Sequence, residues 1–278
     1  MAGKYSLREA YELFVTLSLF LPVNCVLILL ASSLFVAGAP FAAGIGFLTL
    51  SPLMAFIYIA DRWSISEEDR INDPHRTALV EKYRTELLGL AILSILLFEI
   101  SLIVPALSRG LTGVGYVALG HVPIVVLSLY DRLKSLPIPA DSTAVGFAWS
   151  FEIAYIFSVV APQTATPVET VTLLVAWFLI VFAGVEARNI GDVEGDRKTG
   201  KVTLTVMLGQ RAVRRLTVGL KATGVLLLSV LSASPLVFGF LVVHLSSLRF
   251  YRGLEQSCQS GSGQSRQPST VASSTPET

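Results

Sequence analysis

The sequence predicts an all-α protein built as a polytopic bundle of transmembrane helices. Of the 278 residues, 53% are hydrophobic and only 15% are charged, whereas about a quarter of the residues of a soluble domain are charged. The hydrophobic residues form long stretches, and most charged residues lie in the loops between them. Because one helical crossing of a bilayer requires about 20 mostly apolar residues, we expect these stretches to be membrane spans.

The expected spans follow one another in four pairs, each joined by a short, almost uncharged turn. The two final stretches are the shortest. Residues 253–278 are rich in Ser, Gln, Thr, Gly and Pro, a composition typical of disordered chain. We therefore expect one membrane domain over residues 1–252, followed by a disordered polar tail. The eight expected spans are 13–37, 41–60, 87–107, 111–130, 144–161, 168–185, 216–231 and 236–248.

The basic residues indicate how these spans are oriented. An even number of spans places both termini on the same side of the membrane. The loops on that side carry 19 of the 21 Lys and Arg residues, all except Arg109 and Lys221. The positive-inside rule assigns this side to the cytoplasm. We expect a multi-pass integral protein of the cell membrane, with both termini and the charged loops in the cytoplasm.

The most strongly charged passage follows the sixth span directly. Asp192 and Asp196 are four residues apart, so a helical turn places both carboxylates on one face. Asn189 lies three residues earlier and adds a neutral oxygen to the same side. Mg²⁺ prefers such hard oxygens, and it commonly takes one or two carboxylates and completes its shell with water and substrate phosphates. The basic residues that follow are placed to hold phosphate oxygens.

A second acidic loop follows the second span, so each four-helix half carries one at the same place. Asp61 and Asp69 are eight residues apart and are expected to share one helical face, with Glu68 beside them. Pro74 disfavours helix in the residue before it, so the helix is expected to end there and leave Arg76 free to meet an anion. The matching positions of the two loops predict one shared site, with metal ions bridging a diphosphate.

These two loops resemble the motifs of the UbiA family of intramembrane prenyltransferases. The family's first motif is Asn-x-x-x-Asp-x-x-x-Asp followed by Asn-x-Pro-x-Arg, and its second is Asp-x-Glu-Gly-Asp-x-x-x-Gly-x-x-Thr-Leu. The second motif is nearly intact at residues 192–204. In the first, Asp61 stands where the family usually has Asn, and Ile65 stands where the middle Asp is expected. The resemblance covers about residues 10–250.

The resemblance implies a helical bundle, usually of nine spans, around a central cavity that is open to the membrane. Two Mg²⁺ ions would bind the diphosphate of an isoprenoid donor, and a lipophilic acceptor would then be prenylated. The implied partners are the isoprenoid diphosphate, the acceptor and membrane lipid, with no nucleic acid. The acceptor is left open among a quinone precursor, a glycerol lipid, a tetrapyrrole and a carotenoid.

The motifs assign roles to particular residues by position. Ile65 leaves the first motif short of a carboxylate, for which Glu68 is placed to compensate, and the polar tail stands where a ninth span is usual. These two departures favour an alternative, a catalytically impaired homologue that binds an isoprenoid lipid or a partner. The expected metal ligands are Asp61, Glu68, Asp69, Asp192 and Asp196, of which Asp69, Asp192 and Asp196 would be catalytic. The expected substrate-binding residues are Asn72, Arg76, Asn189 and Lys201, whereas Arg62, Arg70 and Arg197 are expected to be ordinary loop charges.

Two further carboxyl groups lie inside expected spans. An ionisable residue in the membrane is costly and is by default a candidate for function. For Glu99 we favour a hydrogen bond between helices. For Glu152 both interpretations stay open, because Trp149, Phe151 and Tyr155 lie nearby in the sequence and are suited to line an acceptor pocket. A lipid phosphotransferase is the least favoured function, because its Asp-Gly-x-x-Ala-Arg element is absent from the sequence.

Overall fold

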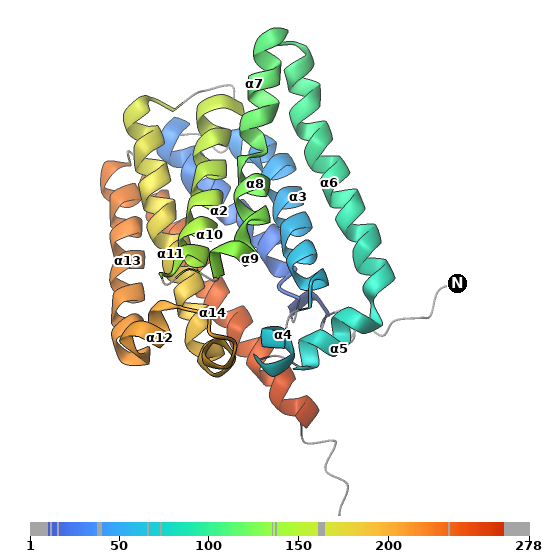
Figure 1. The fold of residues 1–278 in the computed structure, drawn as a ribbon. Helices are drawn as coiled ribbons and strands as arrows, with labels where there is room; N and C mark the ends of the chain where they lie inside the picture. The colour runs from blue at the N-terminus through green and yellow to red at the C-terminus, as the bar shows by residue number, and fades with distance from the viewer. Residues whose placement is uncertain are drawn as a thin grey trace, which may run out of the picture.

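A computed structural model describes residues 11–263 of the chain, except 12, 16, 38–40, 66, 73, 135, 137, 161–164 and 233. Within these described residues the regular elements are all helices, which confirms the all-α prediction. The long helices lie side by side and form a bundle, and short helices gather at one end of it (Figure 1).

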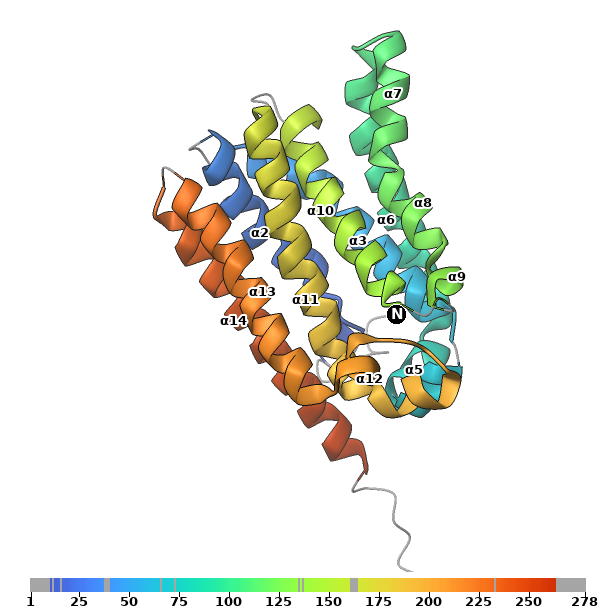
Figure 2. The same ribbon diagram turned by 60° about the vertical axis from the view of Figure 1, so that its left-hand side comes forward.

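The long helices coincide with the expected spans and reverse direction from one to the next (Figures 1 and 2). In chain order they are α2 (Phe20–Ala37), α3 (Phe41–Trp63), α6 (Arg84–Leu107), α7 (Leu111–Gly120) continued by α8 (Val122–Ser128), α10 (Ala140–Tyr155) extended by the π-helical turn Ile156–Val160, α11 (Pro167–Thr199), α13 (Gln210–Leu231) and α14 (Leu236–Gly263). The short helices are α4 (Glu67–Asn72), α5 (Pro74–Lys82), α9 (Tyr130–Lys134) and α12 (Leu204–Leu208).

The apolar character of these helices is that of a membrane bundle. Among the described residues, four helical stretches are long and apolar enough to cross a bilayer, namely 84–107, 111–128, 140–160 and 167–199. Two shorter apolar helices, 20–36 and 236–250, match two further expected spans. Many large apolar side chains of α6 and α7 are exposed, as expected of helices that face lipid. The number of crossings stays a prediction.

The main core lies around α10 and α11. Trp177 of α11 is fully buried, and its indole N–H donates a hydrogen bond to the Ser32 hydroxyl of α2 over 2.9 Å. On the other side of α11, Gly224 of α13 lies so close that an added Cβ would be 2.7 Å from the carbonyl oxygen of Ala176. Glycine at this position therefore allows α13 to pack directly against α11.

A second, smaller core lies at the end of the bundle that holds α4 and α5. Leu17, Ile59, Val80, Tyr83 and Leu87 form most of it, so it joins the segment before α2 to the end of α3, to α5 and to the start of α6. Further apolar side chains pack against this cluster, among them Trp63 and Ile65. This core fixes the position of the first acidic motif.

Several helix boundaries differ from the expected spans, and two of these differences change the interpretation of a segment. Helix α11 does not end with the apolar span but continues to Thr199, so the second charged motif is the last part of a membrane helix. Helix α14 runs to Gly263, beyond the predicted start of the polar tail at residue 253. Residues 264–278 of that tail lie outside the described residues.

Candidate functional site

The two acidic motifs meet at one end of the bundle. Helix α4, which carries part of the first motif, packs against α11, which carries the second. The start of α10 and the short helix α12 lie at the same end (Figure 2). Segments more than a hundred residues apart in the sequence therefore contribute to one polar region, as the matching positions of the two loops predicted.

The end of α11 shapes the second motif. Gly200 has a φ of +74°, a left-handed conformation that favours glycine. The backbone N–H of Lys201 donates to the carbonyl oxygen of Asp196 over 2.8 Å, and the N–H of Gly200 donates to that of Arg197 over 3.4 Å. This pair of bonds is a Schellman turn, which satisfies the last carbonyl groups of a helix. The turn brings Lys201 back beside Asp196.

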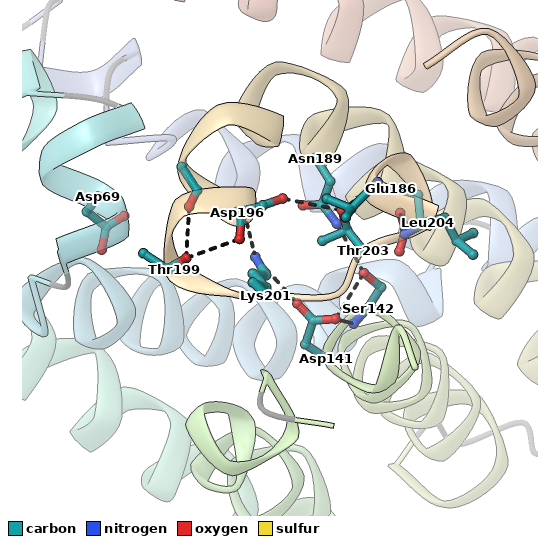
Figure 3. A network of polar contacts seen from close by, with 12 residues as sticks. Asp69, Asp141, Ser142, Glu186, Asn189, Asp196, Thr199, Lys201, Thr203 and Leu204 are labelled. Carbon is teal, nitrogen blue, oxygen red and sulfur yellow. Dashed lines mark hydrogen bonds and ion pairs between the residues drawn. The ribbon is translucent and has the colours of Figure 1, made fainter. Parts of the chain in front are cut away.

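Lys201 lies between two buried carboxyl groups from different helices (Figure 3). Its Nζ is 3.6 Å from Oδ1 of Asp196 on α11 and 3.5 Å from Oδ2 of Asp141 at the start of α10. Asp196 is 0% exposed, Asp141 is 1% exposed and Lys201 is 8% exposed. An ion pair so far from water is costly to form unless its partners are well placed, so this arrangement holds α10, α11 and the following loop in one geometry.

Neutral hydrogen bonds extend this network. The Asn189 amide donates to the Ser142 hydroxyl over 3.3 Å, and the backbone N–H of Ser142 donates to Oδ1 of Asp141 over 2.7 Å. The Thr203 hydroxyl donates to Oδ2 of Asp196 over 3.3 Å, and it also accepts from the backbone of α12 as its N-cap. Asn189 and Asp196 are therefore held on one face of α11, as the sequence predicted.

Asp192 occupies a different environment from Asp196. It lies one turn earlier on α11 and is only partly buried. The helix is continuous through both residues, which confirms the helical spacing that the sequence predicted. Asp196 faces the buried network, whereas Asp192 is accessible from outside it.

The first motif differs from the prediction in two respects. Asp61 and Asp69 do not share a helical face, because α3 ends at Trp63 and α4 begins at Glu67. The chain between the two helices places Ile65 against the smaller apolar core, which a continued helix would not do. Asp61 is exposed and pairs with Arg62 over 3.2 Å. The predicted roles of Glu68 and Asn72 stay predictions, because their side chains lie outside the described residues.

Arg76 was expected to be free to meet an anion, but it is buried and bound to Asp69. Its guanidinium donates to Oδ1 of Asp69 over 2.7 Å. The helix ends before Pro74 as predicted, but α5 begins at Pro74 itself and holds Arg76 in its first turn, since proline is well suited to the first position of a helix. A small pocket opens here, and Ile65 lines it together with Asp69 and Arg76.

Arg62 is not an ordinary loop charge. Its side chain is only 10% exposed, and its buried Nε has no hydrogen-bond partner among the described residues. The pKa of Arg62 is lowered to about 10, mainly by burial and in part by the neighbouring Arg188 and Arg76 guanidinium groups, while the Asp61 and Asp69 carboxylates act in the opposite direction. Arg188 comes from α11, so the two halves of the chain together present three arginines. The carboxylates of Asp61 and Asp69 balance two of these charges, and the remaining excess of positive charge favours an anionic ligand.

The oxygen atoms of this region suit Mg²⁺. Within the described residues no group of three or more His, Cys, Asp or Glu side chains is close enough to hold a metal ion. Mg²⁺ needs only one or two protein carboxylates when a substrate phosphate completes its shell. Each of the two motifs supplies at least one carboxylate to this region. In addition, Oδ2 of Asp141 and Oε1 of Glu186 are buried and make no hydrogen bond among the described residues. The donor set therefore fits the metal.

Two buried carboxyl groups of the site, those of Asp141 and Glu186, had no predicted role. Asp141 was placed in a polar loop, but it lies in the first turn of α10. Glu186 is 0% exposed, and one of its oxygens accepts from the backbone N–H of Leu204 over 3.2 Å. A signal for Glu186 existed, since it lies three residues before Asn189 on the same helical face. Asp141 gave none, because short polar loops commonly contain an aspartate.

The two carboxyl groups inside the bundle have different environments. Oε1 of Glu99 lies 2.8 Å from Nε2 of His121, which confirms the predicted hydrogen bond between helices. Glu152 is fully buried, and neither of its oxygens has a hydrogen-bond partner among the described residues. Both interpretations of Glu152 stay predictions.

Fold and site together define an all-helical protein of the membrane type, with a buried charged site at one end of its bundle. Residues 20–260, most of the chain, match the UbiA prenyltransferase family. The chain therefore belongs to this family, whose general activity is intramembrane prenyl transfer. Searches of curated proteins and of solved structures find no match to the chain.

Proposed function

We propose that the protein transfers a prenyl group from an isoprenoid diphosphate to a lipophilic acceptor in an Mg²⁺-dependent reaction. The observation that carries this proposal is the meeting of the two motifs. Carboxylates and basic side chains from both halves of the chain gather at one end of the bundle. Such a combination suits an anionic ligand that binds together with metal ions, because the carboxylates can hold the metal and the basic side chains can hold the anion.

In this proposal the basic residues bind the diphosphate. Arg76 and Lys201, each held by a carboxylate, and Arg62 and Arg188 beside them would contact its oxygens. Asn72 and Asn189 would add neutral donors. Mg²⁺, held by Asp69, Asp192 and Asp196 with support from Asp61 and Glu68, would neutralise the charge that develops on the leaving diphosphate. Each ion pair fixes its basic side chain before the substrate arrives.

Aromatic rings next to the site would stabilise the prenyl cation. Tyr58 of α3 and Trp149 of α10 are stacked with their ring centroids 6.0 Å apart. Tyr58 is close enough to Arg62 and Arg188 to interact with their charges. A cation over an aromatic face is stabilised by the ring quadrupole. In this proposal the two rings would face the carbon that loses its diphosphate.

We further propose a multi-pass membrane protein whose site faces the cytoplasm. The helices that carry the site end in the most basic segments of the chain, and the positive-inside rule assigns such segments to the cytoplasmic side. The smaller core joins residues just before α2 to this end of the bundle, and α14 extends beyond it (Figure 1). Labelling of single cysteines at the two termini, in intact and in permeabilised cells, would test the orientation.

The direct test of activity is diphosphate release. Purified protein in nanodiscs would receive geranylgeranyl diphosphate and a total lipid extract, with either Mg²⁺ or EDTA. We expect release that requires both Mg²⁺ and the extract, and the mass of the prenylated product would identify the acceptor. Binding of the diphosphate without release under any of these conditions would contradict the proposal.

A second candidate function is that of an impaired homologue that binds an isoprenoid lipid or a partner. One observation favours it. Ile65 lines the pocket that also contains Asp69 and Arg76, at the position where the family motif has its middle Asp. An apolar side chain there removes a metal ligand from the first motif. In this case the diphosphate binds and the chemistry fails.

A further inference from the structure

Two buried carboxyl groups of this site share one lysine. Asp141 is 1% exposed and Asp196 is 0% exposed, and Lys201 lies between them. Glu186, also 0% exposed, belongs to the same polar region (Figure 3). Buried carboxylates are normally paired with cations or bound to metal ions. Oδ2 of Asp141 is within ion-pair distance of Lys201 but makes no hydrogen bond among the described residues. In these two ion pairs one ammonium group therefore balances two carboxylates.

Lys201 occupies the position of a shared cation. Its Nζ lies almost equally far from Asp141 and Asp196, at 3.5 and 3.6 Å, and the three side chains point toward one another in Figure 3. The two carboxylates come from α10 and α11, which pack along each other.

The first motif is the one that lacks a carboxylate. Ile65 stands at the position of its middle Asp and packs against the smaller apolar core. Asp141 lies outside both motifs, yet it is the carboxylate that shares a cation with Asp196. Asp141 is therefore placed to replace the metal ligand that is missing at position 65.

We propose that Asp141 is an Mg²⁺ ligand together with Asp196, and that Lys201 holds the place of the metal until Mg²⁺ binds. This inference rests on the proposed function. Mg²⁺ takes oxygens at about 2.0–2.1 Å and completes its shell with water and phosphate. Both carboxylates therefore move inward when Lys201 leaves, and the displaced ammonium group becomes available to the diphosphate.

A purely structural role for Asp141 makes a different prediction. If Asp141 only positions Lys201, its removal has no effect on metal binding once Lys201 is gone. If Asp141 is a ligand, its removal weakens metal binding whether or not Lys201 is present. The two roles are therefore separated in a background that lacks the lysine.

The experiment measures Mn²⁺ affinity by electron paramagnetic resonance on the full chain in detergent, without substrate. Mn²⁺ shares the oxygen preference of Mg²⁺. The proteins are wild type, Asp141→Asn, Lys201→Met and the double variant, with Glu81→Gln as control, because Glu81 is an exposed acid of α5 that pairs with Arg70 and lies outside both motifs. We expect Lys201→Met to raise the affinity about tenfold by removing a competing charge. We expect Asp141→Asn to lower it about 10- to 100-fold in both backgrounds, and Glu81→Gln to leave it unchanged.

Two results would overturn the inference. One is an unchanged affinity in Lys201→Met, a variant whose result does not require Asp141→Asn to fold. The other is a double variant that binds Mn²⁺ as tightly as Lys201→Met does. Diphosphate release by the wild type, measured separately, tells whether the proposed function survives, because a Mg²⁺-dependent transferase is compatible with either result.

Discussion

The two acidic motifs have the same place in the two halves of the chain but very different surroundings. The second motif is the end of a 33-residue helix, and Asp196 is buried in a network of ion pairs and hydrogen bonds. The first is divided between α3 and α4, and Asp61 is exposed. The difference begins at Ile65, an apolar residue that packs against the smaller core and lines the pocket beside Asp69 where the motif has a carboxylate.

This comparison shows that a repeated charge pattern need not produce a repeated geometry. In the second motif, Gly200 reverses the chain and returns Lys201 to Asp196. In the first, Pro74 starts a new helix, which holds Arg76 against Asp69 over 2.7 Å. Each half thus pairs one aspartate with one basic residue by a different local structure. The second half supplies the more strongly buried pair.

The largest expected effect comes from the second motif. Asp196→Asn and Asp192→Asn should each abolish turnover, with kcat falling by at least about 100- to 1,000-fold, the range for loss of one electrostatic stabiliser. Both variants should fold, because asparagine is nearly isosteric with aspartate. Diphosphate release and size-exclusion chromatography would measure the two properties. Full activity in both variants would disprove the metal assignment, and Glu81→Gln, which changes an exposed acid of α5 outside both motifs, provides the control.

A smaller effect is expected where the first motif lacks its carboxylate. Ile65→Asp should preserve or raise the activity, because it returns a metal ligand to the pocket beside Asp69. The same change removes an apolar side chain from the smaller core, so we also expect a loss of stability of about 1–3 kcal/mol. Steady-state kinetics and thermal unfolding would measure the two effects. A large loss of activity without a loss of folding would show that Ile65 belongs to a rearranged site.

The smallest effect concerns the support of Asp196. Thr203→Val removes the hydroxyl that bonds Asp196 and caps α12. We expect a loss of stability of about 1 kcal/mol, typical of a helix N-cap, and a modest fall in kcat at unchanged KM for the diphosphate. Thr203→Ser retains the hydroxyl and should behave as wild type. A Thr203→Val variant with wild-type kinetics would show that Asp196 does not need this bond.

The sequence was sufficient to predict the helices, because their apolar lengths and the charge distribution follow directly from bilayer thickness. It also predicted that the two motifs meet, since their matching places after the second and sixth spans put both on the same side of the membrane. Asp192 and Asp196 lie on one continuous helix as their spacing indicated. These predictions depend only on helical periodicity and on the side of the membrane on which each loop lies. Both can be inferred from a single sequence.

The contacts between distant residues were not predictable in the same way. Nothing near Asp141 indicates that it shares a cation with Asp196, because that contact depends on how α10 packs against α11. Arg62 resembled the other basic loop residues, since the positive-inside rule accounts for any arginine there. The break in the helix after Trp63 was not predictable from the spacing of Asp61 and Asp69, because that spacing fits a continuous helix. Ile65, between them, packs against the smaller core instead.

The central claim is that the two motifs act on one diphosphate, and a double-mutant cycle tests it most directly. Single-turnover release of diphosphate would be measured for wild type, Asp69→Asn, Asp196→Asn and the double variant. Residues that act as one unit are strongly non-additive, so we predict that the double variant is hardly slower than the slower single variant. Effects that multiply, or an Asp69→Asn variant with wild-type rates, would contradict a shared site.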